Sequence, residues 1–404
     1  MPERERHHSV MPGPCLLCGG PTALGLRLPG ARLAASDLAR DLDIAVCAAC
    51  GFAFQAGADT PEYGEFIRHA YEAWDDKPLF DFPRRSQDNV AAAEIIARHS
   101  GRQARVLEIG SNRGDILALV KERMPEASIL GVDPATHKNL PVPTLRAFFD
   151  PALFSSRFDT VILKQVLEHF ADPAPMLAGA RAVLEDGGLL YLEVPNLTRI
   201  LEGRTDAFIL EHTAYYTLST LRAALSGFEI IEAQEAGSLR VAARKLPGKT
   251  APARFVPPAD GPRQAKEALE GLARLGRGRE RGKELLVAHA AAGGRVLFFG
   301  AYNCFRALYR ELSPLLAGCP CVVADDAMQG DREPVFGLPR VAGPEKGDLV
   351  LLCSNNAEVL DRMWERTAGQ TGQTEQAGGG FAVIRPWSAL LRADGTTSDL
   401  GADT

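Results

Sequence analysis

The chain has 404 residues, of which 46% are hydrophobic and 24% charged, and its formal net charge at pH 7 is −6. A chain of this length is expected to form two or three domains rather than one core. The acidic balance argues against nucleic-acid binding, which requires a basic surface. The first ten residues are charged and lack the apolar segment of a signal peptide, and no apolar run approaches a membrane span. We therefore expect a cytoplasmic protein with reduced cysteines and no membrane partner.

Four of the eight cysteines form two C-x2-C pairs in the first part of the chain. Cys15 and Cys18 make one pair, Cys47 and Cys50 make the other, and a glycine follows each pair, as a zinc-binding turn requires. Four thiolates can close a tetrahedral site and stabilise a region too short to bury its own core. The spacing therefore predicts a structural Zn²⁺ site without a part in catalysis. Two redox pairs, or plain buried thiols, are the alternatives.

The middle of the chain alternates between strand and helix patterns. Helices are expected over residues 88–101, 115–124 and 173–188. Strands are expected over residues 105–110, 128–133 and 189–195, and in residues 158–169 together with an exit loop. Strands that alternate with helices at this spacing predict an α/β fold with a parallel, doubly wound sheet.

The last third of the chain repeats this pattern after a break. Five prolines lie within residues 245–264, which predicts a linker, and a charged helix is expected over residues 265–294. A strand, a turn and a helix follow over residues 295–312, with a further strand at 321–326. The likeness between residues 105–110 and 295–300 fits either a duplicated unit or two separate α/β domains.

These patterns divide the chain into five parts. We expect a zinc-binding region at 11–85, an α/β domain at 86–244, a linker with a helix at 245–290, a second α/β domain at 291–390 and a disordered tail at 391–404.

The turn after the strand at 105–110 reads GSNRG and differs from the dinucleotide pattern GxGxxG. Gly110 supplies the first glycine, but Asn112 replaces the middle one and Gly114 falls at the wrong step. Those glycines are what allow a pyrophosphate to approach the backbone closely. The turn therefore disfavours a nicotinamide or flavin cofactor.

Two acids stand where neighbouring strands end. Glu108 lies at the mouth of the first strand, where a carboxylate suits a ligand that carries an α-amino group and a sulfonium. Asp133 ends the second strand, where an acid accepts hydrogen bonds from ribose hydroxyls, although an Asx turn before Pro134 is an alternative. With Arg113 as the only nearby cation, the site favours a nucleoside without phosphates, such as S-adenosylmethionine (SAM).

The motifs EIGSNRG, GVDPA, VLEHFADP and LEVPN together resemble the class I methyltransferase domain of the sugar C-methyltransferases. The resemblance extends to the order of parts: a four-cysteine zinc region, a methyltransferase domain and a Rossmann-like C-terminal domain. These enzymes methylate nucleotide-linked 4-keto-deoxysugars. The resemblance implies that Gln165 lines the methionine end of SAM and that Phe148 and Phe149 hold the adenine, with core packing as the alternative for the two phenylalanines.

The segment AFILEHTAYYT, residues 207–217, resembles the catalytic segment of that family and implies roles for Glu211 and His212. A carbon next to a ketone must lose a proton before its enolate can attack a methyl sulfonium. A histidine suits this task, and a neighbouring donor must hold the enolate oxygen. The segment departs from the family at Ile209 and Leu210, where a tyrosine and a histidine are usual. These two changes put the sugar substrate in question but leave the cofactor assignment unchanged.

Other candidates follow from the same resemblance. Tyr71, near Trp74, is an approximate counterpart of an upstream catalytic tyrosine, and His169 is expected to orient a loop rather than to catalyse. In the C-terminal domain a usual lysine is absent, so Tyr302 or Arg306 would help to hold the nucleotide-linked sugar, or the domain is only a packing partner.

The sequence thus predicts a SAM-dependent methyltransferase for a small molecule, most simply one that methylates carbon in a nucleotide-linked keto-deoxysugar through a histidine-generated enolate. Methylation of oxygen or nitrogen in a related sugar or natural product is one alternative. A nicotinamide-dependent oxidoreductase or epimerase, and a non-catalytic zinc-containing binding module, are others. We expect a monomer or a weak homo-oligomer.

Overall fold

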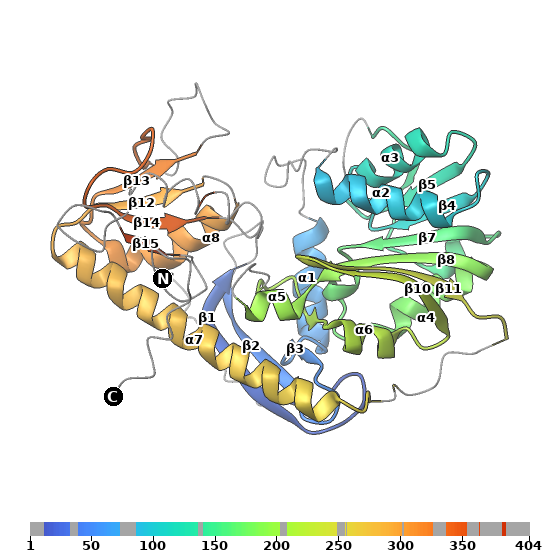
Figure 1. The fold of residues 1–404 in the computed structure, drawn as a ribbon, viewed down its shortest axis with the longest axis horizontal. Coiled ribbons are helices and arrows are strands. Elements are labelled where there is room, and N and C mark those ends of the chain that lie inside the picture. Colours follow the sequence, from blue (N-terminus) through green and yellow to red (C-terminus); the bar gives the residue numbers. More distant parts are fainter. Residues whose placement is uncertain are drawn as a thin grey trace.

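The computed structural model describes residues 12–32, 39–72, 86–135, 140–202, 208–248, 255, 257–300, 303–325, 337–353, 363 and 382–384. These residues form three sheets, and one long helix spans two of them (Figure 1). The predicted tail and the loop after the second C-terminal strand lie outside the described residues. No helix in the described part of the chain is long and apolar enough to cross a membrane.

The N-terminal sheet is antiparallel and takes its last strand from the middle of the chain. Its strands are β1 (Thr22–Arg32), β2 (Ala39–Cys47), β3 (Ala53–Gln55) and β9 (Ala214–Tyr215), in that spatial order. Helix α1 (Pro61–Glu72) follows β3. Ala53 and Phe54 pair with Tyr215 and Ala214. The N-terminal sheet is therefore joined directly to a segment that lies, in the sequence, between two strands of the seven-stranded central sheet.

The central sheet has seven strands in the order β10-β11-β8-β7-β4-β5-β6. They are β4 (Arg105–Ile109), β5 (Ser128–Val132), β6 (Thr144–Leu145), β7 (Phe158–Lys164), β8 (Leu184–Pro195), β10 (Phe228–Glu235) and β11 (Ser238–Lys245). Strands β4 to β8 are parallel, and β11 is inserted antiparallel between β8 and β10. The predicted doubly wound α/β sheet is confirmed, with one antiparallel strand near its edge.

Both faces of the central sheet are covered, as a parallel sheet requires. Successive residues of a strand point to opposite faces, so Val106 packs with helices α2 (Gln87–His99) and α3 (Asp115–Arg123). Leu107 packs on the other face with α4 (Ala174–Val183), α6 (Leu218–Ala224) and the four cysteines. Helix α5 (Leu197–Leu201) joins the core of the N-terminal sheet. The expected helix at 173–188 ends early, because β8 begins at Leu184 and extends through residues 185–188.

The C-terminal sheet is parallel, with strands in the order β13-β12-β14-β15. Its elements are β12 (Val296–Phe299), α8 (Asn303–Leu312), β13 (Cys321–Ala324), β14 (Leu349–Leu352) and β15 (Ala382–Ile384). This parallel sheet with its helix fits the predicted Rossmann-like character. The expected strand at 321–326 ends two residues early.

Helix α7 (Gly261–Ala291) spans the N-terminal and C-terminal sheets (Figure 1). It begins four residues before the expected start, because a proline is tolerated in the first helical turn and Pro262 occupies it. Leu272 and Leu275 pack in the core of the N-terminal sheet, whereas Leu286 packs in the core of the C-terminal sheet. The predicted linker is therefore shorter than residues 245–264.

Candidate active site

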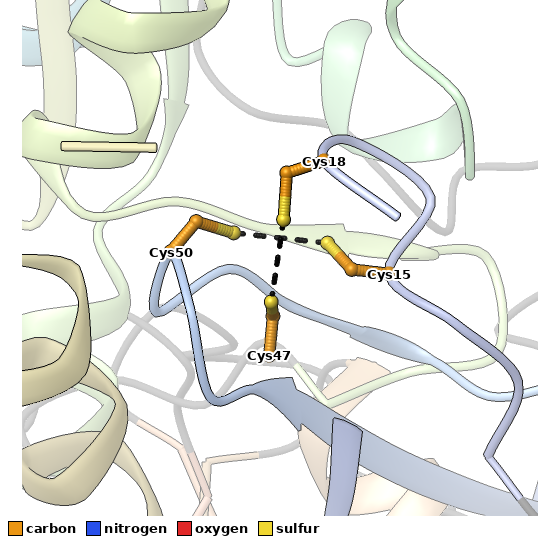
Figure 2. A group of neighbouring side chains, drawn as sticks. All are labelled: Cys15, Cys18, Cys47 and Cys50. Atoms are coloured by element: carbon orange, nitrogen blue, oxygen red, sulfur yellow. Dashed lines mark hydrogen bonds between the residues drawn. The ribbon is translucent and has the colours of Figure 1, made fainter. Parts of the chain in front are cut away.

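The four cysteines of the two C-x2-C pairs converge on one point (Figure 2). The Cys15 and Cys50 sulfurs are 3.7 Å apart, and the Cys18 and Cys47 sulfurs are 3.5 Å apart. Four thiolates about 2.3 Å from a tetrahedral zinc ion lie about 3.8 Å from one another. The observed spacing fits a Zn²⁺ ion, and four sulfur ligands leave no coordination position for catalysis.

The local backbone explains why the sulfurs converge. The Gly19 N–H donates to the Cys15 carbonyl at 2.8 Å, and the Gly51 N–H donates to the Cys47 carbonyl at 2.9 Å. Both glycines have φ near +70°, a conformation that glycine adopts without steric cost. Gly261, the first residue of α7, packs directly on the second turn. The cysteine cluster therefore also anchors the helix that spans two sheets.

The turn after β4 is shaped for close approach. A Cβ atom at Gly110 would lie 2.5 Å from a methyl group of Val166, and one at Gly114 would collide with Val142. Both glycines have positive φ, and Gly114 precedes helix α3. The turn is therefore packed tightly against residue 166, in the loop that follows β7.

Two non-glycine residues of the described chain have a left-handed backbone, Asn112 with φ of 46° and Gln165 with φ of 53°. Such conformations cost free energy and concentrate at functional sites. Both residues are predicted to bind the cofactor. Gln165 is held in place because its backbone N–H donates to the Glu193 carbonyl at 2.8 Å and its side-chain amide donates to the Ser238 hydroxyl at 3.2 Å.

Glu108 and Ser111 are buried polar residues at this turn. One carboxylate oxygen of Glu108 and the Ser111 hydroxyl have no hydrogen-bond partner among the described residues. Burial, the largest cause, raises the pKa of Glu108 well above its ordinary value, and the nearby charge of Lys164 opposes that rise. A buried carboxyl oxygen without a partner suits a ligand that brings a cation, as the α-amino group of SAM would.

Asp133 combines the two roles expected of it. Its two oxygens accept hydrogen bonds from the backbone N–H of Asn112 at 2.7 Å and of Ala135 at 2.8 Å. The second bond is the predicted Asx turn, and each carboxylate oxygen keeps a further lone pair for a ribose hydroxyl. Asp133 is therefore compatible with SAM and also fixes the turn that would hold it.

Replacing Asp133 with alanine is expected to weaken SAM binding about 10- to 100-fold, because the proposed charge-assisted hydrogen bonds to the ribose and the two bonds to the backbone N–H groups of Asn112 and Ala135 are lost. Isothermal calorimetry of the zinc-loaded protein measures this change. Asp172→Ala is a matched control, since Asp172 makes the same local bond, to the Ala174 N–H at 3.0 Å, at an exposed site. Equal affinities in the two variants would remove Asp133 from the cofactor site.

The two predicted adenine contacts differ in their surroundings. Phe148 is 50% exposed and directly follows Ala147, whose N–H donates to the Asp133 carbonyl at 3.2 Å. Phe149 instead packs against Phe154, at 6.1 Å between ring centroids, and against Gly179 of α4. The structure therefore favours Phe148 for the adenine and core packing for Phe149.

His212 and Glu211 lie in the segment that leads into β9. Glu211 is buried, whereas His212 is partly exposed. The His169 and His212 rings meet edge to face with their centroids 5.1 Å apart, and His169 Nδ1 lies 2.8 Å from the Glu211 carbonyl oxygen. His169 therefore ties the loop after β7 to the candidate catalytic segment, which fits its expected orienting role.

A third ionisable group, which the sequence prediction missed, belongs to the same cluster. Glu168 is fully buried, and its carboxylate lies within 4.8 Å of ring nitrogens of His169 and His212. Burial, the largest cause, raises the pKa of Glu168 to about 8. In the sequence, the motif VLEHF gave no sign that this glutamate is buried.

A second residue that the sequence analysis missed, Tyr63 of α1, holds the backbone of the candidate catalytic segment. Its buried hydroxyl donates to the Leu210 carbonyl and contacts the side-chain oxygen of Gln55 at 2.9 Å. Leu210 itself is buried in the core of the N-terminal sheet and cannot contact a substrate. The sequence around Tyr63 does not distinguish helix from strand, so neither α1 nor this contact was predicted.

Three predicted site residues are placed only partly or not at all. Tyr71 lies in α1 and Arg306 in α8, but their side chains lie outside the described residues, as do Trp74 and Tyr302. Their proposed roles remain predictions.

The chain is similar to known methyltransferases. Residues 66–233 match a family model described as a methyltransferase domain. The chain is 26% identical to the C-methyltransferase NovU of Streptomyces niveus over 397 residues, which cover 88% of both chains. It is 34% identical to a ubiquinone biosynthesis O-methyltransferase of Cereibacter sphaeroides over 107 residues, 23% of this chain and 41% of that one.

Among solved structures, an O-methyltransferase family protein from Burkholderia thailandensis is similar at 18% identity and a TM-score of 0.33. The match covers 47% of this chain and 68% of that chain.

Proposed function

We propose that this SAM-dependent methyltransferase adds a methyl group to a carbon next to the ketone of a nucleotide-linked keto-deoxysugar. The observation that carries the proposal is the position of His212. It meets His169 and Glu168 in the loop after β7, and the same loop packs on the cofactor turn at Gly110. A base beside the cofactor site is what methylation of carbon requires. The match to a C-methyltransferase along 88% of both chains supports the same choice.

In this proposal each group has a defined task. Glu108 binds the α-amino end of SAM and Asp133 its ribose, and SAM when bound supplies an electrophilic methyl group. His212 would remove the proton from the carbon, and the electron pair of the broken C–H bond becomes the enolate that forms the new C–C bond. The bond between the methyl group and the sulfonium sulfur would break in the same step, with its electron pair left on the sulfur of the departing thioether. His169 holds the Glu211–His212 segment in place through the Glu211 carbonyl.

We assign two further roles on the same basis. The four-cysteine cluster holds a structural Zn²⁺, supported by sulfur spacings of 3.5 and 3.7 Å. The C-terminal sheet helps to hold the nucleotide of the acceptor through Tyr302 or Arg306, as the family resemblance implies.

A second candidate function is methylation of oxygen in a related acceptor. It is favoured by the loss of two polar groups from the catalytic segment, where Ile209 and the buried Leu210 stand. An O-methyltransferase needs no carbon acid and therefore no exchange of a carbon-bound proton.

The deciding experiment supplies the zinc-loaded protein with SAM and a nucleotide-linked 4-keto-deoxysugar in D₂O. NMR is expected to show deuterium incorporation at the carbon next to the ketone, followed by the signal of a methyl group bonded to that carbon. A methyl ether without deuterium exchange would support the second function. If neither a methylated product nor deuterium exchange were observed, the assignment of a keto-sugar acceptor would be contradicted.

A further inference from the structure

We infer that Glu168 is a positioning residue whose buried carboxyl group sets the tautomer and the proton affinity of His212. The inference rests on the proposed role of His212 as the base. It assigns to Glu168 a function that neither the family comparison nor the sequence pattern provides.

The Glu168 carboxyl group lies within 4.8 Å of a ring nitrogen of His212, so a small side-chain rotation could bring the two groups into hydrogen-bond contact. Its two carboxyl oxygens have no hydrogen-bond partner among the described residues, although the side chain is fully buried. Its backbone carbonyl accepts hydrogen bonds from the Thr213 N–H at 2.8 Å and from the Thr213 hydroxyl at 3.2 Å. Thr213 follows His212 directly, so these two bonds hold the backbone of Glu168 beside the backbone of His212. A buried carboxyl group without a partner calls for a functional explanation.

The neighbouring His169 cannot donate a hydrogen bond to an ionised Glu168. His169 Nδ1 lies 2.8 Å from the Glu211 carbonyl, and a carbonyl only accepts, so Nδ1 carries the hydrogen. Burial lowers the pKa of His169, which keeps the ring neutral and leaves Nε2 without a hydrogen to donate. An ionised Glu168 carboxylate can therefore accept a hydrogen bond from His212, but not from the bare Nε2 of His169.

The charges around Glu168 decide when it is ionised. Lys164, at the end of β7, favours the carboxylate, whereas burial and Glu193 on β8 oppose it, and the resulting pKa is about 8. Burial raises the pKa of the nearby Tyr216 hydroxyl well above its ordinary value, and the charges of Glu168 and Asp172 add to that rise. Lys164 is itself shared, since it lies 3.2 Å from Glu193 and acts on Glu108 as well.

The pH determines whether Glu168 can assist proton removal by His212. Above a pH of about 8, Glu168 is ionised and can accept the N–H of His212, so that the other ring nitrogen is the one that takes the substrate proton. The imidazolium that forms is then stabilised by an adjacent carboxylate, as in other carboxylate–histidine pairs. Proton removal is therefore expected to accelerate as the pH rises toward 8 and to level off above it.

The test compares the wild type with Glu168→Gln, which keeps the shape of the side chain and removes its charge. NMR titration of the histidine rings, with His212→Asn to assign the signal, is expected to show the His212 pKa falling by about one to two units. The rate of deuterium exchange into the keto-sugar is measured against pH in the same variant. The acid limb of this profile is expected to move to lower pH by the same amount as the His212 pKa, and the plateau rate is expected to fall tenfold or more. Glu168→Asp, which restores the charge, should recover most of both changes.

Glu232→Gln is the matched control, because it removes a carboxylate that lies 2.7 Å from another histidine, His99, away from the site. An unchanged His212 pKa in Glu168→Gln would overturn the inference, even if activity fell. The inference would also be overturned if the wild type bound two zinc ions per chain and Glu168→Gln bound only one. Glu168, His169 and His212 would then form a metal site. Absence of exchange in the wild type would contradict the proposed function instead, because the ring titration needs no acceptor.

Discussion

Replacing His212 with asparagine is expected to slow both deuterium exchange and methyl transfer by about 100- to 10,000-fold, because the proposed general base is removed. The affinity for SAM should stay unchanged, because Glu108 and Asp133 bind SAM in the proposal and His212 does not. Steady-state rates and NMR exchange measure the first effect, and calorimetry measures the second.

His99→Asn provides the control for this substitution. His99 pairs with Glu232 at 2.7 Å on the far edge of the central sheet and has no part in the proposed reaction. Normal exchange in His212→Asn would move the base elsewhere, whereas loss of SAM binding would show that the substitution disturbs the fold and not the chemistry alone.

The central sheet could be predicted because its pattern is local. Each strand is a continuous apolar run and each helix begins after a turn, so residues 105–110 and 128–133 stand out without any partner. Strand β9 could not be predicted, because two residues carry no periodicity. Its place is decided by pairing of Ala214 and Tyr215 with residues about 160 positions away, and such pairing depends on the whole fold.

The candidate site divides in the same way. The cysteine cluster follows from spacing alone, and Asp133 follows from its place at the end of a strand. Glu168 was missed because a glutamate in a short loop ordinarily faces water, and only the packing of β7, β8 and β9 shows that this one is buried. Phe148 and Phe149 are adjacent and alike in sequence, so only the contact with Phe154 separates their roles.

Replacing Cys47 with serine is expected to release the zinc and to lower the free energy of unfolding by about 4 kcal/mol or more, because the cysteine cluster is part of the core under the central sheet. Metal analysis and thermal unfolding measure these changes. Cys353→Ser is the matched control, since Cys353 is an equally buried thiol in the C-terminal core and lies outside the cluster.

The same substitution is expected to stop methyl transfer while the folded protein still binds SAM at low temperature. The reason is the path from the metal to the base: Cys47 ends β2, β2 pairs with β3, and β3 pairs with β9, which begins two residues after His212. Gln55 of β3 adds a hydrogen bond from its N–H to the Thr213 carbonyl at 2.9 Å. Full turnover without zinc would show that this strand pairing does not position His212, and the metal would then contribute to stability alone. Loss of turnover with SAM binding intact would show that the zinc region positions the proposed catalytic histidine.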